Sequence, residues 1–317
     1  MSKVVVVVPT IREECIKAFL EAWHPHLEGC TILIIEDNPE RSFQVKGSNV
    51  LHFAWAEIDR DLGEKAWIVP RRTDCIRSYG FLKAWHLGAD VIISLDDDCY
   101  PACAGFVQSH LQKLCSMHVS DAWCSTLKGI LPRGMPYLKR TREGKVVLNH
   151  GLWVGIPDYD AVTQLALTRF SAPHEIHEQV IPRGLFFPMC GMNIAFRREL
   201  TPAMYFLLMG RDWPFDRFGD IWCGILAKRI CDHLGYIVTS GHPLVEHKRA
   251  SNVWANLRKE VAGYEANEEF WVVIDNAILT SDSVTGCYAQ LAGLLKRRGG
   301  YWEKLGEAML LWLSLFE

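Results

Sequence analysis

Residues 91–98 read VIISLDDD, an apolar run that passes directly into three consecutive aspartates. A short apolar run bounded by polar residues is typical of a buried β-strand. Because adjacent carboxylates repel one another, a fold keeps three of them together only where a cation or full solvation compensates their charge. Asp96 and Asp98 can point to one side of such a turn and bind a divalent metal, Mn²⁺ or Mg²⁺. A solvated acidic turn is the alternative interpretation.

The same alternation of apolar runs and amphipathic stretches extends outward from this segment. Strands are predicted at 4–8, 31–35 and 51–55, and helices at 13–23, 74–87 and 221–234. Strands separated by helices indicate a mostly parallel sheet, with ligands bound beyond the carboxyl ends of the strands. From about residue 268 onward the pattern predicts two or three further helices. We therefore expect an α/β fold with two parts, 1–262 and 263–317, the second packed on the first or used in self-association.

Composition excludes several classes of protein. The 317 residues are 49% hydrophobic and 22% charged, which is enough for a substantial core and unlike a disordered chain. The formal net charge of -3 gives no basic excess of the kind that nucleic-acid binders show, so no nucleic-acid partner is expected. Eleven cysteines lack any C-x-x-C pair and no signal peptide precedes them, which predicts reduced thiols and a cytoplasmic protein. No apolar run approaches the roughly 18 residues that cross a bilayer.

Two segments beside the acidic triplet resemble the GT-A glycosyltransferases. Arg77, three residues before Gly80, lies on the helix before the strand and would face phosphate or donor sugar, unless it is an ordinary surface arginine. Downstream, 190–198 resembles the Gly-rich acceptor-side strand of that superfamily, and 218–222 its following acidic motif. Asp220 in that motif would act as a general base, hold the sugar, or cap the helix. This likeness implies a GT-A-type, Rossmann-like sheet.

Longer stretches resemble one family, the reversibly glycosylated polypeptides, which include plant UDP-arabinopyranose mutases. The matching stretches are 9–12 (PTIR), 150–160 (HGLWVGIPDYD), 189–210 beginning MCGMNIAF, 230–236 (ICDHLGY) and 247–260 (HKRASNVWANLRKE). They run from the first strand to about residue 260. Two features depart from the family pattern. Gly219 stands where the family has the first of two acids, and 133–145 is unusually basic.

The resemblance implies a role for individual residues. Asp37 would contact the base or ribose, Lys65 would approach the donor, and His247 would join Asp96 and Asp98 as a metal ligand, with Asp97 completing the triplet. Arg142 matches the arginine linked in the family to self-glycosylation, and with Asp220 and Arg77 it is a candidate catalytic residue. The remaining candidates for nucleotide-sugar binding are Pro9, Thr10, Arg12, Trp153, Asp158, Tyr159, Asp160, Gly191 and Asn193.

Three functions follow as expectations. The first is metal-dependent transfer of a glycosyl group from a UDP- or GDP-sugar to an acceptor, either a sugar or a protein hydroxyl or guanidinium of the chain itself. The alternative is a mutase that interconverts pyranose and furanose forms. The third is a non-catalytic nucleotide-sugar-binding subunit, favoured by Gly219 and by the apolar tail 309–316, which could bury itself in a homo-oligomer.

Overall fold

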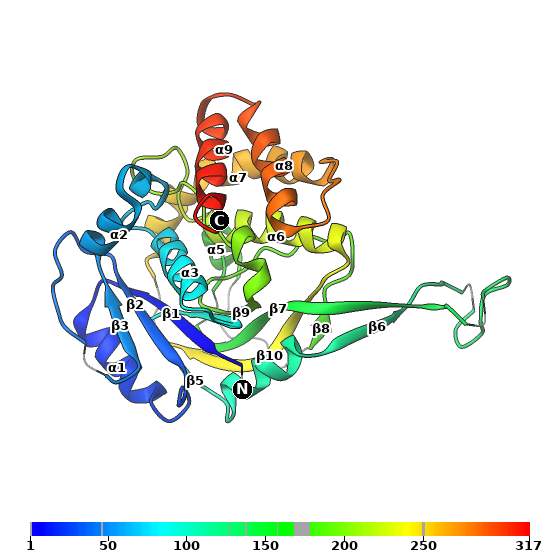
Figure 1. Cartoon of the computed structure of the whole chain (residues 1–317), viewed down its shortest axis with the longest axis horizontal. Coiled ribbons are helices and arrows are strands. Elements are labelled where there is room, and N and C mark those ends of the chain that lie inside the picture. Colours follow the sequence, from blue (N-terminus) through cyan, green and yellow to red (C-terminus); the bar gives the residue numbers. More distant parts are fainter. Residues whose placement is uncertain are drawn as a thin grey trace.

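The computed structural model describes residues 2–45, 47–125, 127–136, 138–156, 158–167, 178–248 and 251–317. These residues form one large twisted sheet flanked by helices on both faces, with a group of helices from the C-terminal part at one side (Figure 1). The strand order along the sheet is β3-β2-β1-β4-β9-β7-β10-β5. The expected α/β, Rossmann-like class is confirmed.

The sheet is mixed and less parallel than predicted: among the described residues four strand pairings are parallel and five are antiparallel. In one half, β3 (Val50–Phe53), β2 (Thr31–Glu36), β1 (Val4–Thr10) and β4 (Val91–Leu95) pair in parallel. In the other half, β7 (Thr141–Gly155) pairs in parallel with β10 (Ile237–His247). The antiparallel strand β9 (Asn193–Arg197) joins the halves, and β5 (Cys99–Pro101) closes the far edge against β10.

The two faces of β1 bury different sets of helices, because successive side chains of a strand point to opposite sides. Val4, Val6 and Val8 pack with residues of α1 (Glu13–Trp23) and α4 (Phe106–Leu114). Val5 and Val7 belong to the larger core cluster of α3 (Arg77–His86), α6 (Gly219–Leu234) and the C-terminal helices. The run of valines therefore holds both layers of the fold together.

The last part of the chain belongs to this larger core. Helix α7 (Val253–Asp275) continues through position 262, and α8 (Val284–Lys296) and α9 (Gly300–Leu313) follow it. Trp312 is fully buried, donates its indole N–H to the Pro202 carbonyl at 3.0 Å, and stacks on Tyr205. The apolar tail thus docks within the chain. The division of the chain into 1–262 and a helical extension, 263–317, stays a prediction.

The shorter elements complete the path. These are α2 (Trp55–Leu62), α5 (Ala161–Ala166), β6 (Met117–Asp121), β8 (Gln179–Val180) and the 3₁₀ turns Gly63–Ile68, Asp74–Ile76 and Arg198–Ala203. The strand predicted at 51–55 ends at Phe53, because the Glu57 side chain accepts the Ala54 N–H at 2.8 Å and fixes the start of α2. All eleven cysteines are unpaired, as expected for reduced thiols. In the part of the chain that the structure describes, no helix is long and apolar enough to cross a membrane.

Candidate active site

A cleft opens at the carboxyl ends of the parallel strands, where ligands of such sheets bind. Its outer cavity, of about 580 Å³, is bounded by the segments that follow β1, β2 and β4. A central cavity of about 280 Å³ shares Arg77, Asp96 and Arg217 with the first. An inner cavity of about 450 Å³ shares Asp158, Cys190 and Asp220 with the central one. The three cavities therefore form one continuous cleft.

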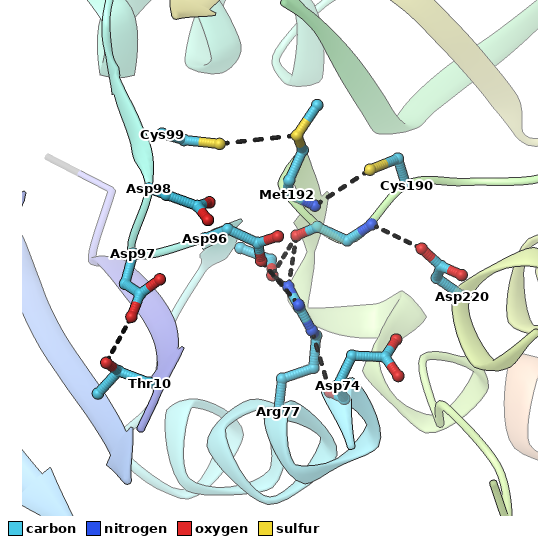
Figure 2. Close-up of polar contacts among 12 residues, drawn as sticks. Thr10, Asp74, Arg77, Asp96, Asp97, Asp98, Cys99, Cys190, Met192 and Asp220 are labelled. Carbon is cyan, nitrogen blue, oxygen red and sulfur yellow. Dashed lines mark hydrogen bonds and ion pairs between the residues drawn. The ribbon is translucent and has the colours of Figure 1, made fainter. Parts of the chain in front are cut away.

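The aspartates of the acidic triplet have different main partners, although Arg12 lies near two of them, 2.5 Å from Asp97 and 3.6 Å from Asp98. Asp96 accepts a hydrogen bond from Arg77 at 2.7 Å. Asp97, which is only 5% exposed, accepts from the Thr10 hydroxyl at 2.6 Å (Figure 2). It also accepts from the Arg12 guanidinium. Asp98 directly precedes β5 and lies beside His247 at the end of the neighbouring strand β10. Thus Thr10 and Arg12 lie in the cleft as predicted, and they act on Asp97.

Arg77 is buried, so it is not the surface arginine of the alternative interpretation. Its guanidinium donates to Ser94 at 2.8 Å and to the Gly191 carbonyl at 2.6 Å, in addition to Asp96. Burial lowers the pKa of Arg77, but the neighbouring carboxylates outweigh this effect and raise the pKa overall. Arg77 therefore stays charged. A Cβ at Gly191 would lie 2.8 Å from this guanidinium, which explains the glycine. Arg77 thus positions Asp96 and lines the outer and central cavities.

His247 reaches the acidic triplet through strand pairing. In the register of β5 with β10, His247 lies opposite Cys99, and its Nε2 is 3.8 Å from Asp98. Its Nδ1 lies 2.8 Å from the Ile156 carbonyl, which can only accept a hydrogen bond, so Nδ1 carries a proton. In the neutral ring this leaves the lone pair of Nε2 on the side of Asp98. Burial, with Asp96 and Asp97 beside it, raises the pKa of Asp98 to about 6.

The carboxylate of Asp98 and the imidazole of His247 fit a divalent metal that takes few protein ligands. The imidazole and carboxylate already face one another, and the charge that raises the Asp98 pKa is the charge that a cation would neutralise. Within the described residues no group of three or more His, Cys, Asp or Glu lies close enough to enclose a metal unaided. A metal here would therefore complete its coordination with ligand oxygens and water.

The central cavity brings several carboxylates together around Gly191. Asp220 accepts the Gly191 N–H at 3.2 Å, and Asp158 accepts the Cys190 thiol at 2.5 Å. Burial, together with Asp74 and Asp158, raises the pKa of Asp220 to about 8. Asp220 is thus protonated at neutral pH, although the cleft reaches part of its surface. The position before α6 is Phe218, so Asp220 is not the helix cap that was the alternative.

Asp37 lies at the floor of the outer cavity, where Pro9 and Arg12 also line the wall. It accepts from the Trp55 indole at 2.7 Å and from the Thr73 backbone N–H at 3.0 Å. Burial raises the pKa of Asp37. The residue is in place for the predicted contact with base or ribose, with both oxygens also tied to protein donors.

The inner cavity contains the sugar-side candidates Trp153, Asp158, Tyr159 and Asp160. Asp160 caps α5 by accepting the Thr163 N–H at 2.9 Å and also accepts from Tyr264 at 2.9 Å. The indole nitrogen of Trp153 and Nδ1 of His150 are buried in the cavity wall without a protein partner. Such atoms normally find a partner, so a bound polar molecule would satisfy them.

Three predicted residues lie away from this cleft. Lys65 donates to the Ser314 hydroxyl at 2.9 Å, beside the end of α9. Asn193 is fully buried and donates to the carbonyls of Leu152 and Pro243. Arg142 lies near the start of β7, whose other end pairs with His247. At about 3.3 Å per residue, the strand separates Arg142 from that end by roughly 40 Å.

Other cleft residues were missed by sequence reasoning. They are Arg72, Asp74, Cys190, Arg217, Glu260 and Tyr264. Arg217 lines all three cavities and donates to Glu260 at 2.8 Å. Arg72 and Arg217 both have positive φ, 57° and 63°, a strained conformation for arginine that often occurs at functional sites. No local pattern predicts this, although Glu260 closes a stretch that the family resemblance already marked.

Comparison with known proteins assigns the chain to a family. The model of the reversibly glycosylated polypeptides matches residues 1–317. The chain belongs to the reversibly glycosylated polypeptide family. The resemblance stated from the sequence is therefore confirmed, and it covers the C-terminal helices as well as the sheet.

Curated members of this family match over nearly the whole chain. A "Probable UDP-arabinopyranose mutase 1" of Pisum sativum is 36% identical over 338 residues, 98% of this chain and 90% of the relative. UDP-arabinopyranose mutase 1 of Arabidopsis thaliana is 34% identical, with 98% and 91% covered. A protein of the same name from Oryza sativa subsp. japonica is 33% identical, with 98% and 90% covered. These relatives carry the names of enzymes that act on a nucleotide sugar.

Proposed function

We propose that this protein is a mutase that interconverts the pyranose and furanose forms of a UDP-linked pentose such as arabinose. The observation that carries the proposal is the continuous cleft, in which a nucleotide-sized cavity with an acidic triplet opens into a central cavity with a protonated carboxyl. The full-length similarity to proteins named UDP-arabinopyranose mutases supports it and favours this alternative over general glycosyl transfer.

The chemistry needs one proton donor and one acceptor beside the sugar. The bond from C1 to the diphosphate breaks and later re-forms, with its electron pair moving to and from the diphosphate. Meanwhile the ring oxygen O5 leaves C1 and gains a proton, and O4 bonds to C1 and loses one. The net reaction is an isomerisation and requires no co-reactant.

Asp220 and Asp158 suit the two proton-transfer roles because their environments differ. Asp220 holds a proton at neutral pH and would give it to O5 as a general acid. Asp158 is a hydrogen-bond acceptor in the same cavity and would take the proton of O4. Two carboxyl groups placed in different environments beside one reacting centre are a recurring solution for acid–base catalysis.

The residues at the mouth of the central cavity would hold the diphosphate. Asp98 and His247 would bind Mn²⁺ or Mg²⁺ directly, and Asp96, which Arg77 fixes in place, would meet the metal through a bound water. A bound metal would neutralise charge on the diphosphate. Arg217 adds a further positive charge where all three cavities meet. Asp37 would contact the nucleoside.

Glycosyl transfer to an acceptor is the second candidate, and one observation favours it. The inner cavity extends beyond the central one and has two unpartnered polar atoms in its wall, His150 Nδ1 and Trp153 Nε1. An acceptor could occupy this space, and a small rotation of either side chain would bring its buried nitrogen to an acceptor hydroxyl. The free thiols also fit a reducing compartment, so we propose that the protein acts in the cytoplasm.

The test is incubation of the protein with Mn²⁺ and a panel of UDP- and GDP-sugars. The mutase predicts a UDP-furanose product without free UDP. Transfer predicts free nucleoside diphosphate together with a mass increment on the protein or on an added sugar. Metal-dependent binding without any turnover would refute both and leave a binding subunit.

A further inference from the structure

A two-stranded ribbon, which we call the arm (described residues 117–125, 127–136 and 138–145), extends beyond the body of the sheet and away from the C-terminal helices (Figure 1). It consists of β6, the first part of β7 and the loop between them. Met117 pairs with Lys145 and Asp121 with Thr141, and within the described residues β6 pairs only with β7. A ribbon of two strands without a covered face is at best marginally stable in water.

The surface of the arm is apolar and basic. Among its described residues only Gly144 is buried. Its loop exposes large hydrophobic side chains, with Leu138 at 97% exposure: Trp123, Leu127, Ile130, Leu131 and Leu138. The arm contains six Lys or Arg and two acids, whereas the rest of the chain has 28 Lys or Arg and 35 acids. An apolar surface of this kind marks a docking site, and its charge calls for an acidic partner.

The second half of α7 has the complementary surface. Between Val261 and Asp275 the helix has four acids and no Lys or Arg, and all four acids are exposed: Glu265, Glu268, Glu269 and Asp275. Of these, Glu269 pairs with Arg298 of the same chain at 3.0 Å. Val261, Trp271 and Val272 are exposed among them, at 56%, 41% and 37%. The opposite side of the helix is buried through Phe270 and Ile274. This outward face, which we call the α7 face (261–275), is therefore apolar and acidic.

We propose that the arm of one copy of this chain docks on the α7 face of a second copy. The chain carries both halves of an interface, apolar on each side and opposite in charge. Its own arm extends away from its own helix α7 (Figure 1). Reciprocal exchange of two arms would close a twofold dimer, the commonest symmetry of soluble oligomers. It would also cover both strands of the ribbon, which supplies the packing that the ribbon lacks.

A charge-swap experiment tests this pairing. One variant reverses the arm (Arg133→Glu, Lys139→Glu, Arg140→Glu), and another reverses the α7 face (Glu265→Lys, Glu268→Lys). Multi-angle light scattering should give twice 36.1 kDa for the wild type and 36.1 kDa for each variant alone. An equimolar mixture of the variants should return to twice that mass, because each arm then meets an oppositely charged α7 face. The control, Glu28→Lys with Glu40→Lys, makes the same charge change as the α7-face variant at two exposed positions outside both surfaces. It should stay dimeric.

Other outcomes would overturn the proposal. One is a wild type that stays at 36.1 kDa up to about 100 μM protein, a concentration at which even weak specific pairs associate. A second is association that survives reversal of either surface, which would place the interface elsewhere. A third is a monomer whose arm binds vesicles containing phosphatidylserine, because the arm would then be a lipid-binding element. Circular dichroism of each variant separates loss of pairing from loss of fold.

Discussion

Replacement of Asp220 by asparagine should make stability less dependent on pH. The folded chain keeps this carboxyl protonated up to a pH of about 8, whereas in the unfolded chain it ionises near pH 4. Between these values the folded state holds one more proton, so stability falls as the pH rises, by about 1.4 kcal/mol per unit at most. Asparagine is neutral at every pH, so the variant escapes this loss.

The expected magnitude follows from that slope. From pH 5 to pH 7 the variant should gain on the wild type by about 3 kcal/mol at most, and by roughly half of this because the cleft admits solvent. The two oxygens of Asp220 accept the backbone N–H groups of Gly191 and Ile221, and the single oxygen of an asparagine side chain cannot accept both. The lost hydrogen bond lowers the free energy of unfolding by about 1 kcal/mol at every pH. Only the change with pH is therefore diagnostic.

Urea unfolding at pH 5, 6, 7 and 8 measures the difference, with metal-free protein. The exposed Asp212→Asn is the matched control and should give a flat difference. The same Asp220→Asn variant should lose mutase turnover by at least about 100-fold, because a general acid contributes that much. A stability difference that does not change between pH 5 and pH 8 would refute the assignment of a protonated carboxyl at this position.

Three further predictions concern the cleft and the core. Gly191→Ala should weaken UDP binding about 10-fold in calorimetry, since the new Cβ would lie 2.8 Å from the buried guanidinium behind it, whereas Gly293→Ala has no Cβ contact closer than 3.7 Å and should leave binding unchanged. His247→Ala should weaken Mn²⁺ binding by roughly 10- to 100-fold, measured by electron paramagnetic resonance, and unchanged affinity would remove His247 from the site. Trp312→Ala should lower the free energy of unfolding by about 3–5 kcal/mol. Leu310→Ala on the same helix, at a side chain 38% exposed, should cost under about 1.5 kcal/mol by the same urea assay.

Much of the sheet was predictable because its signals are local. The strand 91–95 and the helix 13–23 are observed at the predicted bounds, since apolar runs and helical periodicity depend on neighbouring residues alone. The position of the acidic triplet at a cleft follows from the same pattern, because parallel strands present their carboxyl ends at one edge.

The rest required knowledge of distant contacts. Asn193 follows a Gly-rich motif, yet its side chain is turned into the core by the carbonyls of Leu152 and Pro243. Arg142 follows the family pattern, but it lies near the start of the long strand β7, at the end opposite to the one that pairs with His247. Arg217 has a positive φ, and its guanidinium is held by Glu260 on α7. None of these partners can be inferred from residues close in the sequence.

The most direct test of the account is conversion in both directions. The protein with Mn²⁺ should bring UDP-arabinopyranose and UDP-arabinofuranose, supplied separately and without any acceptor, to the same final mixture of the two. Anion-exchange chromatography separates and quantifies both. If neither UDP-sugar changes, or if free UDP accumulates in place of the other isomer, the cleft does not carry out the proposed isomerisation.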